Sequence, residues 1–199
     1  MTLLKYLNQE RLHMTKIKLK SRELVYCAMF VALIAIGAFI KVPIPVVPFT
    51  LQFLFTMLAG LLLGGSLGGF SVLCYILLGL IGLPIFTEGG GFQYLLKPSF
   101  GYIIGFCIAA YVTGNIANCV SRPTMKRLLC ANFIGLLIVY TVGMAYYYVI
   151  CNYVIDTPIG LGPLFLYCFV LAVPGDMALC ILSAFLAKRL IPVIQNLSV

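Results

Sequence analysis

A single acidic side chain inside an apolar run is the residue best placed to do chemistry. Asp176 lies in the stretch VLAVPGDMALC, residues 170–180. An ionisable group at this depth of a membrane costs roughly 3 kcal/mol, so its presence indicates a functional site. The same carboxylate closely follows Pro174, and it could accept hydrogen bonds from the free amides of a helix that begins there. Ligand contact and helix capping are both open, and one carboxylate can do both.

A second group of polar residues lies in GGGFQYLLKPSFGY, residues 89–102. Its three glycines permit positive φ angles or close approach of the backbone to a ligand, although a flexible loop has the same composition. Lys97 is the one basic residue of this stretch, and it either pairs with a ligand carboxylate or extends to the membrane surface. Tyr94 and Tyr102 have apolar rings with polar tips, which suit a cavity wall or an interfacial aromatic belt.

An amide side chain lies near the start of another apolar run. Gln52, in PFTLQFLF, can both donate and accept hydrogen bonds, which suits a urea-like or amide-like ligand group, although a hydrogen bond between helices explains it equally well. Catalysis is not expected, because the single histidine, His13, lies in the amino-terminal tail and Asp176 has no second acid in its run. We expect no metal site, no cofactor and no ATPase activity, since the chain contains no phosphate-binding P-loop.

The elements that must position these residues are membrane helices. The chain has 199 residues, of which 63% are hydrophobic and 9% charged, whereas a soluble domain is about 25% charged. A helix needs roughly 20 apolar residues to cross the hydrocarbon core, so about six crossings fill the chain and leave no room for a soluble catalytic domain. Hydropathy therefore predicts an all-α integral membrane protein with six transmembrane helices, at residues 23–41, 49–64, 67–84, 100–120, 128–151 and 164–187.

These segments form one domain in our interpretation, because no repeat or linker separates them. The membrane domain covers residues 23–190, between a basic amino-terminal tail of residues 1–22 and a short carboxy-terminal tail of residues 191–199. Met14 begins the stretch MTKIKLKSREL, so translation starts either there or at Met1. In the first case residues 1–13 are a start-site extension.

The basic residues predict the orientation of the helices. The chain has 13 of them, and 11 fall on one side if six helices alternate: Lys5, Arg11, Lys16, Lys18, Lys20, Arg22, Arg122, Lys126, Arg127, Lys188 and Arg189. Only Lys41 and Lys97 are left for the other side. The positive-inside rule then places both termini in the cytoplasm. This distribution, rather than a basic patch on a soluble face, accounts for the net charge of +8 and excludes nucleic acid as a partner.

The opposite side then carries three unusual connections. These are KVPIPVVPF, residues 41–49, the glycine-rich stretch described above, and NYVIDTPIGLGP, residues 152–163. Prolines stop a helix from continuing, and irregular backbone close to lipid occurs only where protein or a water-filled cavity satisfies its polar groups. We therefore expect the outer ends of the helices to enclose a cavity covered by these loops.

The first helix has one face of small residues. Ala28, Ala32 and Ala35 recur at spacings of four and three, which places them on one side of a helix, where another helix can approach closely. The partner is either another helix of the same bundle or a separate subunit.

Taken in order along the chain, these stretches resemble the BioY family of biotin-specific substrate-binding (S) components of energy-coupling factor (ECF) transporters. The resemblance extends over the chain from about Met14. It is carried by VPIPVVPFTLQ (42–52), LLGLIGLPIFTEGGG (77–91), KPSFGYIIGF (97–106) and VPGDMALC (173–180). The first-helix pair Ala28 and Ala32 is similar to the motif through which S components dock on a transmembrane coupling subunit.

The resemblance implies a six-helix S-component fold with a biotin site near the outer surface of the bacterial cytoplasmic (inner) membrane. Asp176 would then face the ureido group of biotin or its polar surroundings, with Gln52, Gly90, Tyr94 and Tyr102 around the ligand. Two positions depart from the family pattern, where a lysine often stands at Leu179 and an arginine sometimes at Ile103. Because these basic residues are missing, we expect Lys97 to hold the carboxylate of biotin.

The function expected from the sequence is therefore biotin capture outside the cell and delivery inward. The partners are membrane lipid and, in one version, an ECF coupling subunit with ABC-type ATPases; in another the protein works alone. An S component for a different small vitamin and an integral membrane enzyme are the alternatives.

Overall fold

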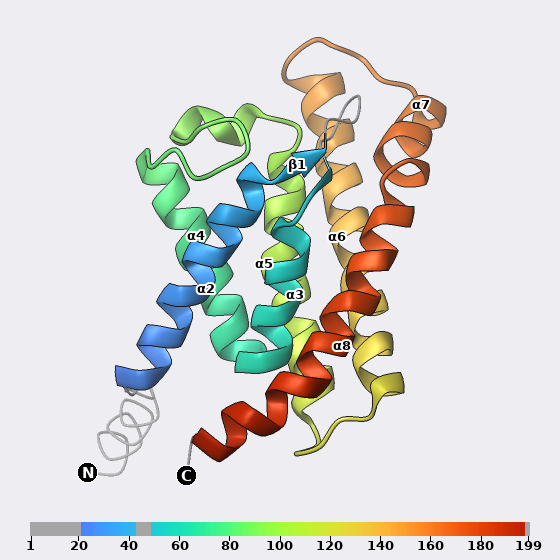
Figure 1. The fold of residues 1–199 in the computed structure, drawn as a ribbon. Helices are drawn as coiled ribbons and strands as arrows, with labels where there is room; N and C mark the ends of the chain where they lie inside the picture. Colours follow the sequence, from blue (N-terminus) through green and yellow to red (C-terminus); the bar gives the residue numbers. More distant parts are fainter. Residues whose placement is uncertain (1–20, 43–48, 198–199) are drawn as a thin grey trace, which may run out of the picture.

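The computed structural model describes residues 21–42 and 49–197, and their fold is almost entirely helical (Figure 1). The longer helices are α2 (Ser21–Phe39), α3 (Gln52–Leu63), α4 (Gly65–Ile81), α5 (Phe100–Asn118), α6 (Met125–Tyr153) and α8 (Val173–Leu197). The shorter ones are the 3-10 helix η1 (Phe92–Leu96), α7 (Leu161–Phe165) and the π-helix η2 (Leu166–Val170).

Each of the six predicted apolar segments contains a helix, but the helices differ in length. Among the described residues four helical stretches are long and apolar enough to cross a membrane: α2, α5, α6 and the combined segment Leu161–Ile194. Helices α3 and α4 are apolar but have only 12 and 17 residues. An all-α protein with several candidate membrane spans is thus confirmed, and six crossings stay a prediction.

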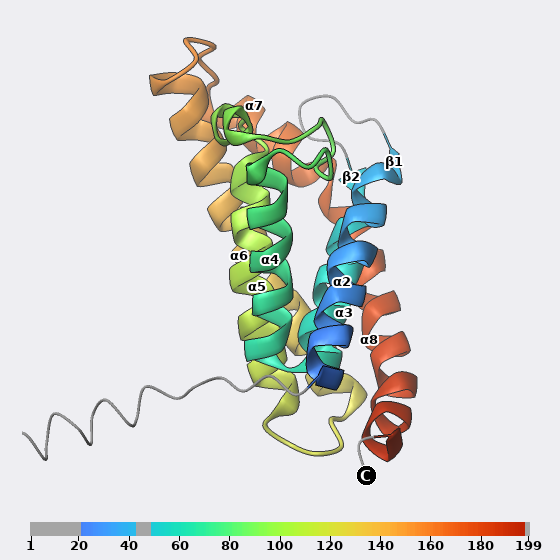
Figure 2. The ribbon, with the colours of Figure 1, turned by 90° about the vertical axis from the view of Figure 1, so that its left-hand side faces the viewer.

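The long helices lie side by side in a bundle in which α3 is central. Helix α3 packs against α2, α4, α5 and α8, while α5 packs most extensively against α6. Seen from the side, α4, α5 and α6 form one half of the bundle, and α2, α3 and α8 the other (Figure 2). Helix α2 begins and α8 ends at the same end of the bundle, and the glycine-rich loop and the short strands lie at the other (Figure 1).

Glycine lets three helices of the bundle approach at van der Waals distance. A Cβ atom on Gly68 of α4 would lie 2.7 Å from the Cα atom of Gly60 on α3, and one on Gly60 would overlap the carbonyl of Ala110 on α5. Small residues at such crossings allow close backbone packing. The turn between α3 and α4 is correspondingly tight, because Gly64 has a φ of +84° and α4 begins at the next residue.

The last apolar segment is broken, although not at the proline. After η2 the regular hydrogen bonding is interrupted at residues 171–172, and α8 begins at Val173. Pro174 lies in the first turn of α8, where a missing N–H group costs nothing, so this proline starts the helix instead of ending one. The break sets Asp176 at the beginning of α8, since its own amide donates to the carbonyl of Ala172 (3.2 Å).

Two short strands, which the sequence did not predict, join α2 to α3. Strand β1 (Lys41–Val42) pairs in antiparallel fashion with β2 (Phe49–Thr50), so that Lys41 lies opposite Thr50. The three prolines of this connection, Pro43, Pro45 and Pro48, fall outside the described residues, as does most of the amino-terminal tail.

Candidate ligand-binding site

A cavity opens at the end of the bundle that carries the loops. Its free interior volume is about 60 Å³, below the roughly 300–1,000 Å³ of usual small-molecule sites, so the cavity is narrow in this structure. Its wall comes from β2, the starts of α3, α5 and α8, the middle of α6, η2, and the loop after α4. Four of the residues predicted from the sequence line it: Gln52, Tyr94, Tyr102 and Asp176.

Gln52 brings an unpaired donor to the wall. It is the first residue of α3 and only 3% exposed. Its Nε2 atom has no hydrogen-bond acceptor among the described residues. The hydroxyl of Tyr75, which donates to the carbonyl of Ile85 (2.9 Å), lies near this amide, but its oxygen does not form a hydrogen bond of normal geometry with Nε2. A buried N–H group without a partner is costly, so Gln52 is suited to donate to an acceptor on a ligand.

Asp176 is fixed by a tyrosine of the facing helix. The hydroxyl of Tyr140, on α6, donates to Oδ2 of Asp176 at 2.6 Å. Tyr140 also packs its ring edge-to-face against Tyr102, with centroids 6.0 Å apart, and the Tyr102 hydroxyl donates to the carbonyl of Cys168 (3.3 Å). These contacts hold the carboxyl group and two aromatic rings in a defined arrangement within the cavity wall.

The loop between α4 and α5 closes one side of the cavity through aromatic packing. Phe86 is fully buried, and its ring contacts Tyr94 with centroids 4.5 Å apart. The hydroxyl of Tyr94 shares a hydrogen bond of 2.8 Å with Oγ1 of Thr87, which also lines the cavity. Tyr94 is therefore held at both its ring and its hydroxyl group, and it is only 2% exposed.

The glycines of this loop fold it back onto α4. Gly89 and Gly91 have φ angles of +112° and +100°, which other residues rarely adopt. Gly90 does not line the cavity; it lies against the carbonyls of Leu83 and Gly79, where a Cβ atom would overlap backbone. The structure thus shows a packing requirement at Gly90, and its contact with a ligand stays a prediction.

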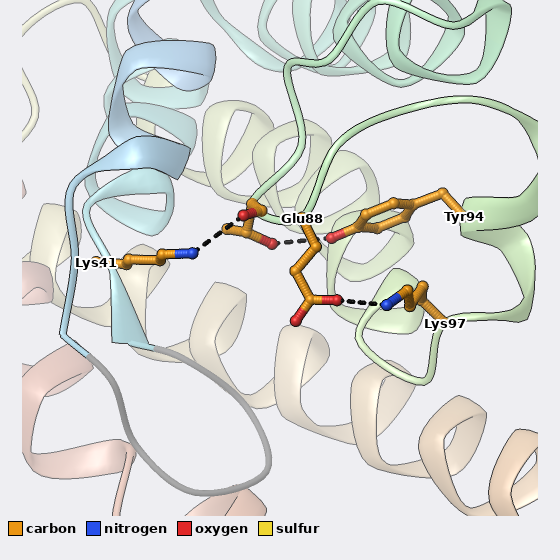
Figure 3. A network of polar contacts seen from close by, with 5 residues as sticks. Lys41, Glu88, Tyr94 and Lys97 are labelled. Atoms are coloured by element: carbon orange, nitrogen blue, oxygen red, sulfur yellow. Dashed lines mark hydrogen bonds and ion pairs between the residues drawn. The ribbon is translucent and has the colours of Figure 1, made fainter.

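Lys97 lies outside the cavity wall and is engaged by an acid. Its Nζ atom is 2.8 Å from Oε2 of Glu88, and both side chains are about half exposed, at 49% and 44%. Figure 3 shows the Glu88 side chain directed towards Lys97. The neighbouring Glu88 carboxylate raises the pKa of the Lys97 ammonium group above its ordinary value. The charge of Lys97 is compensated by Glu88, and its predicted role in ligand binding is untested.

Several polar residues at the site were not predicted from the sequence. Tyr140 stands within a long apolar run and is one of 12 tyrosines, so nothing in its local sequence distinguishes it. Thr50, Thr87 and Ser99 also line the cavity. Glu88 carried a signal that was overlooked, since it is an acid nine residues before Lys97 in the same loop.

The small face of the first helix is exposed at two of its three positions, while Ala35 is half-buried against the core. Ala28 and Ala32 of α2 are exposed, whereas Cys27, Phe30 and Ile34 of the same helix are buried. The face is thus open along at least two of its positions. Docking of a separate subunit on this surface stays a prediction.

The fold and the cavity together define a class: a helical membrane protein with a polar-lined cavity at one end of its helix bundle. Comparison with known proteins gives the family. The family model for the BioY family matches residues 11–196, and the chain belongs to this family.

Named relatives agree with this assignment. A protein of Lysinibacillus sphaericus named "Probable biotin transporter BioY" is 50% identical over 87% of this chain and 88% of its own length. The "Biotin transporter BioY" of Thermotoga maritima is 37% identical over 85% of this chain and 95% of its own. Among solved structures, the crystal structure at 2.1 Å of the S-component for biotin from an ECF-type ABC transporter superposes with a TM-score of 0.71. It is 30% identical, and the match covers 89% of this chain and 94% of that one.

Proposed function

We propose that this protein is a biotin-binding S component that captures biotin at one face of the bacterial cytoplasmic (inner) membrane and delivers it inward. The observation that carries the proposal is the unpaired Nε2 atom of Gln52 at the wall of a cavity in a BioY family fold. Transport, and not catalysis, is the activity named for the relatives. The earlier alternative of a membrane enzyme has no such support.

The chemistry of the wall suits the ureido ring of biotin. This ring has one carbonyl acceptor and two N–H donors. Gln52 Nε2 donates to the carbonyl, and the carboxyl group of Asp176, oriented by Tyr140, accepts from an N–H group. The rings of Tyr94 and Tyr102 provide apolar surface for the remainder of the bicycle. The carbonyl and one of the two N–H groups of the ureido ring then have partners, and such paired polar contacts give selectivity for a polar ligand.

The proposed topology has six crossings with both termini in the cytoplasm. Basic residues support it, because Lys188 of α8 donates to the carbonyl of Pro123 in the α5–α6 connection (2.8 Å), at the end of the bundle where α2 begins. Lys126 and Arg127 lie at the same end, at the start of α6. The cavity opens at the opposite end, which is then the outer face. Helices α3 and α4 are short, and in this topology they cross the membrane packed against longer helices.

Docking on an ECF module is the proposed source of energy. The exposed Ala28 and Ala32 of α2 offer a surface on which a helix of a coupling subunit can pack closely. ABC-type ATPases would then drive release of biotin into the cytoplasm. A protein that works alone is the other version, and it needs no such contact.

The test is uptake of labelled biotin by cells that lack other biotin transporters. We expect uptake when this chain is expressed together with an ECF coupling subunit and its ATPases. Uptake that persists without the module supports the solitary version. If the same cells take up another vitamin but no biotin, that vitamin is the substrate, and the assignment to the S-component fold still holds.

A further inference from the structure

The cavity lacks a cation among its wall residues, yet biotin carries a carboxylate. No lysine, arginine or histidine is among the residues that line it. At this end of the described chain the basic side chains are those of Lys41 and Lys97. Lys97 is already paired with Glu88. The question is therefore which positive charge is left for an anionic ligand.

Lys41 is fixed at the rim of the cavity by its position in strand β1. It lies directly opposite Thr50 of β2, and opposite residues of an antiparallel pair project their side chains on the same face. Thr50 is nearly buried and lines the cavity. The stem of Lys41 therefore starts beside the cavity wall, on the side where the ligand would lie.

A second contact places the ammonium group itself next to the cavity. Nζ of Lys41 donates to the carbonyl of Thr87 at 3.2 Å, and Thr87 is the wall residue that also holds Tyr94. Figure 3 shows Lys41 and Lys97 approaching this loop from opposite sides, with the Glu88 carboxylate turned towards Lys97. An ammonium group has three donors, so Lys41 keeps two for a ligand.

Charge balance distinguishes the two lysines. The chain has five acidic residues, Glu10, Glu23, Glu88, Asp156 and Asp176. None of the four that the structure describes forms an ion pair with Lys41. Lys41 thus has no anionic partner among the described residues, whereas the charge of Lys97 is already compensated by Glu88.

We propose that Lys41, and not Lys97, pairs with the carboxylate of the ligand and makes the site selective for an acid over its neutral analogues. The proposal rests on the proposed function, and it identifies the anionic group of the substrate as a recognised feature. Glu88 contributes by occupying Lys97, which leaves one accessible positive charge at the rim.

The experiment compares biotin with biotinol, in which an alcohol replaces the carboxylic acid, by equilibrium binding to the purified full chain in detergent. The parent protein is expected to bind biotin about tenfold more tightly than biotinol, a difference of about 1.4 kcal/mol. Lys41→Met is expected to abolish this preference while its affinity for biotinol stays within about twofold of the parent's, which also shows that the variant is folded. Lys41→Arg retains the charge and should retain the preference.

Lys126→Met, which removes an exposed lysine at the opposite end of the bundle, is the matched control. The proposal is overturned if Lys41→Met still prefers biotin, if it loses affinity for both compounds equally, or if Lys97→Met removes the preference instead. Failure of the parent protein to bind either compound would instead overturn the proposed function.

Discussion

Replacing Gln52 with methionine should stabilise the empty protein and weaken ligand binding at the same time. The Nε2 atom of Gln52 is buried at the cavity wall without an acceptor, and an unsatisfied buried donor costs about 1–3 kcal/mol. Methionine has a similar shape and no donor. The variant therefore removes a cost from the ligand-free state, and it removes a hydrogen bond from the bound state.

The expected changes in melting temperature and in biotin affinity follow from the cost of the unsatisfied donor. For a chain of this size about 1 kcal/mol raises the melting temperature by roughly 2–4 °C, so we expect a rise of a few degrees without biotin. In the complex the ureido carbonyl loses its donor, which should lower the affinity by about 10- to 100-fold at 1.4 kcal/mol per tenfold. Stability and affinity thus change in opposite directions.

The assay can use the cysteines of the protein, since the chain has no tryptophan. A thiol-reactive fluorophore reports unfolding when the buried Cys27, Cys151, Cys168 and Cys180 become accessible. Gln93→Met is the matched control, because Gln93 is exposed in the loop at the same end of the bundle. A Gln52→Met protein that melts lower than the parent would show that Nε2 is satisfied without ligand, and one that binds biotin as tightly would show that Gln52 makes no hydrogen bond to it.

Three further changes test other parts of the site. Asp176→Asn keeps an acceptor for Tyr140 but places an amide donor against the ligand, and should weaken biotin binding by about tenfold or more. The control Asp156→Asn, in an exposed loop, should leave the biotin affinity measured by titration calorimetry unchanged. Equal losses of affinity in the two variants would contradict the role of Asp176. Glu88→Gln should lower the pKa of Lys97 back towards its ordinary value, measured by NMR titration of labelled lysine. Because that pKa is raised in the folded protein, the ion pair is complete below the ordinary lysine pKa and is lost only as pH rises through the raised one. Titration of Lys97 should therefore not alter biotin binding between about pH 6 and 9. A Lys97 pKa that is the same in Glu88→Gln as in the parent protein would contradict the ion pair. Ala32→Leu on α2 should abolish copurification with an ECF coupling subunit while biotin binding in detergent is unaffected, and retained copurification would exclude this surface.

The polar residues of the cavity could be predicted when they stood out against an apolar background. Gln52 and Asp176 are costly in lipid wherever the helices lie, so their types and surroundings sufficed. Tyr140 could not be predicted, because a tyrosine is ordinary in such a run and its role depends on which face of α6 meets α8. That register is a property of packing and not of local sequence.

The backbone features show the same limit. Three glycines in a row predicted unusual backbone, but not that Gly89 and Gly91 adopt positive φ while Gly90 packs on α4. Pro174 marked an irregularity in the last segment, yet a proline is compatible with both a helix end and a helix start, and the structure has a start. The π-helix η2 that precedes this start was likewise not predicted from the sequence.

The central claim is most directly tested by equilibrium binding of labelled biotin to the purified protein in detergent, without partner subunits and with unlabelled vitamins as competitors. We expect one biotin bound per chain, displaced by excess biotin and not by other vitamins. A folded protein that binds no biotin, or whose label is displaced equally well by an unrelated vitamin, would contradict it.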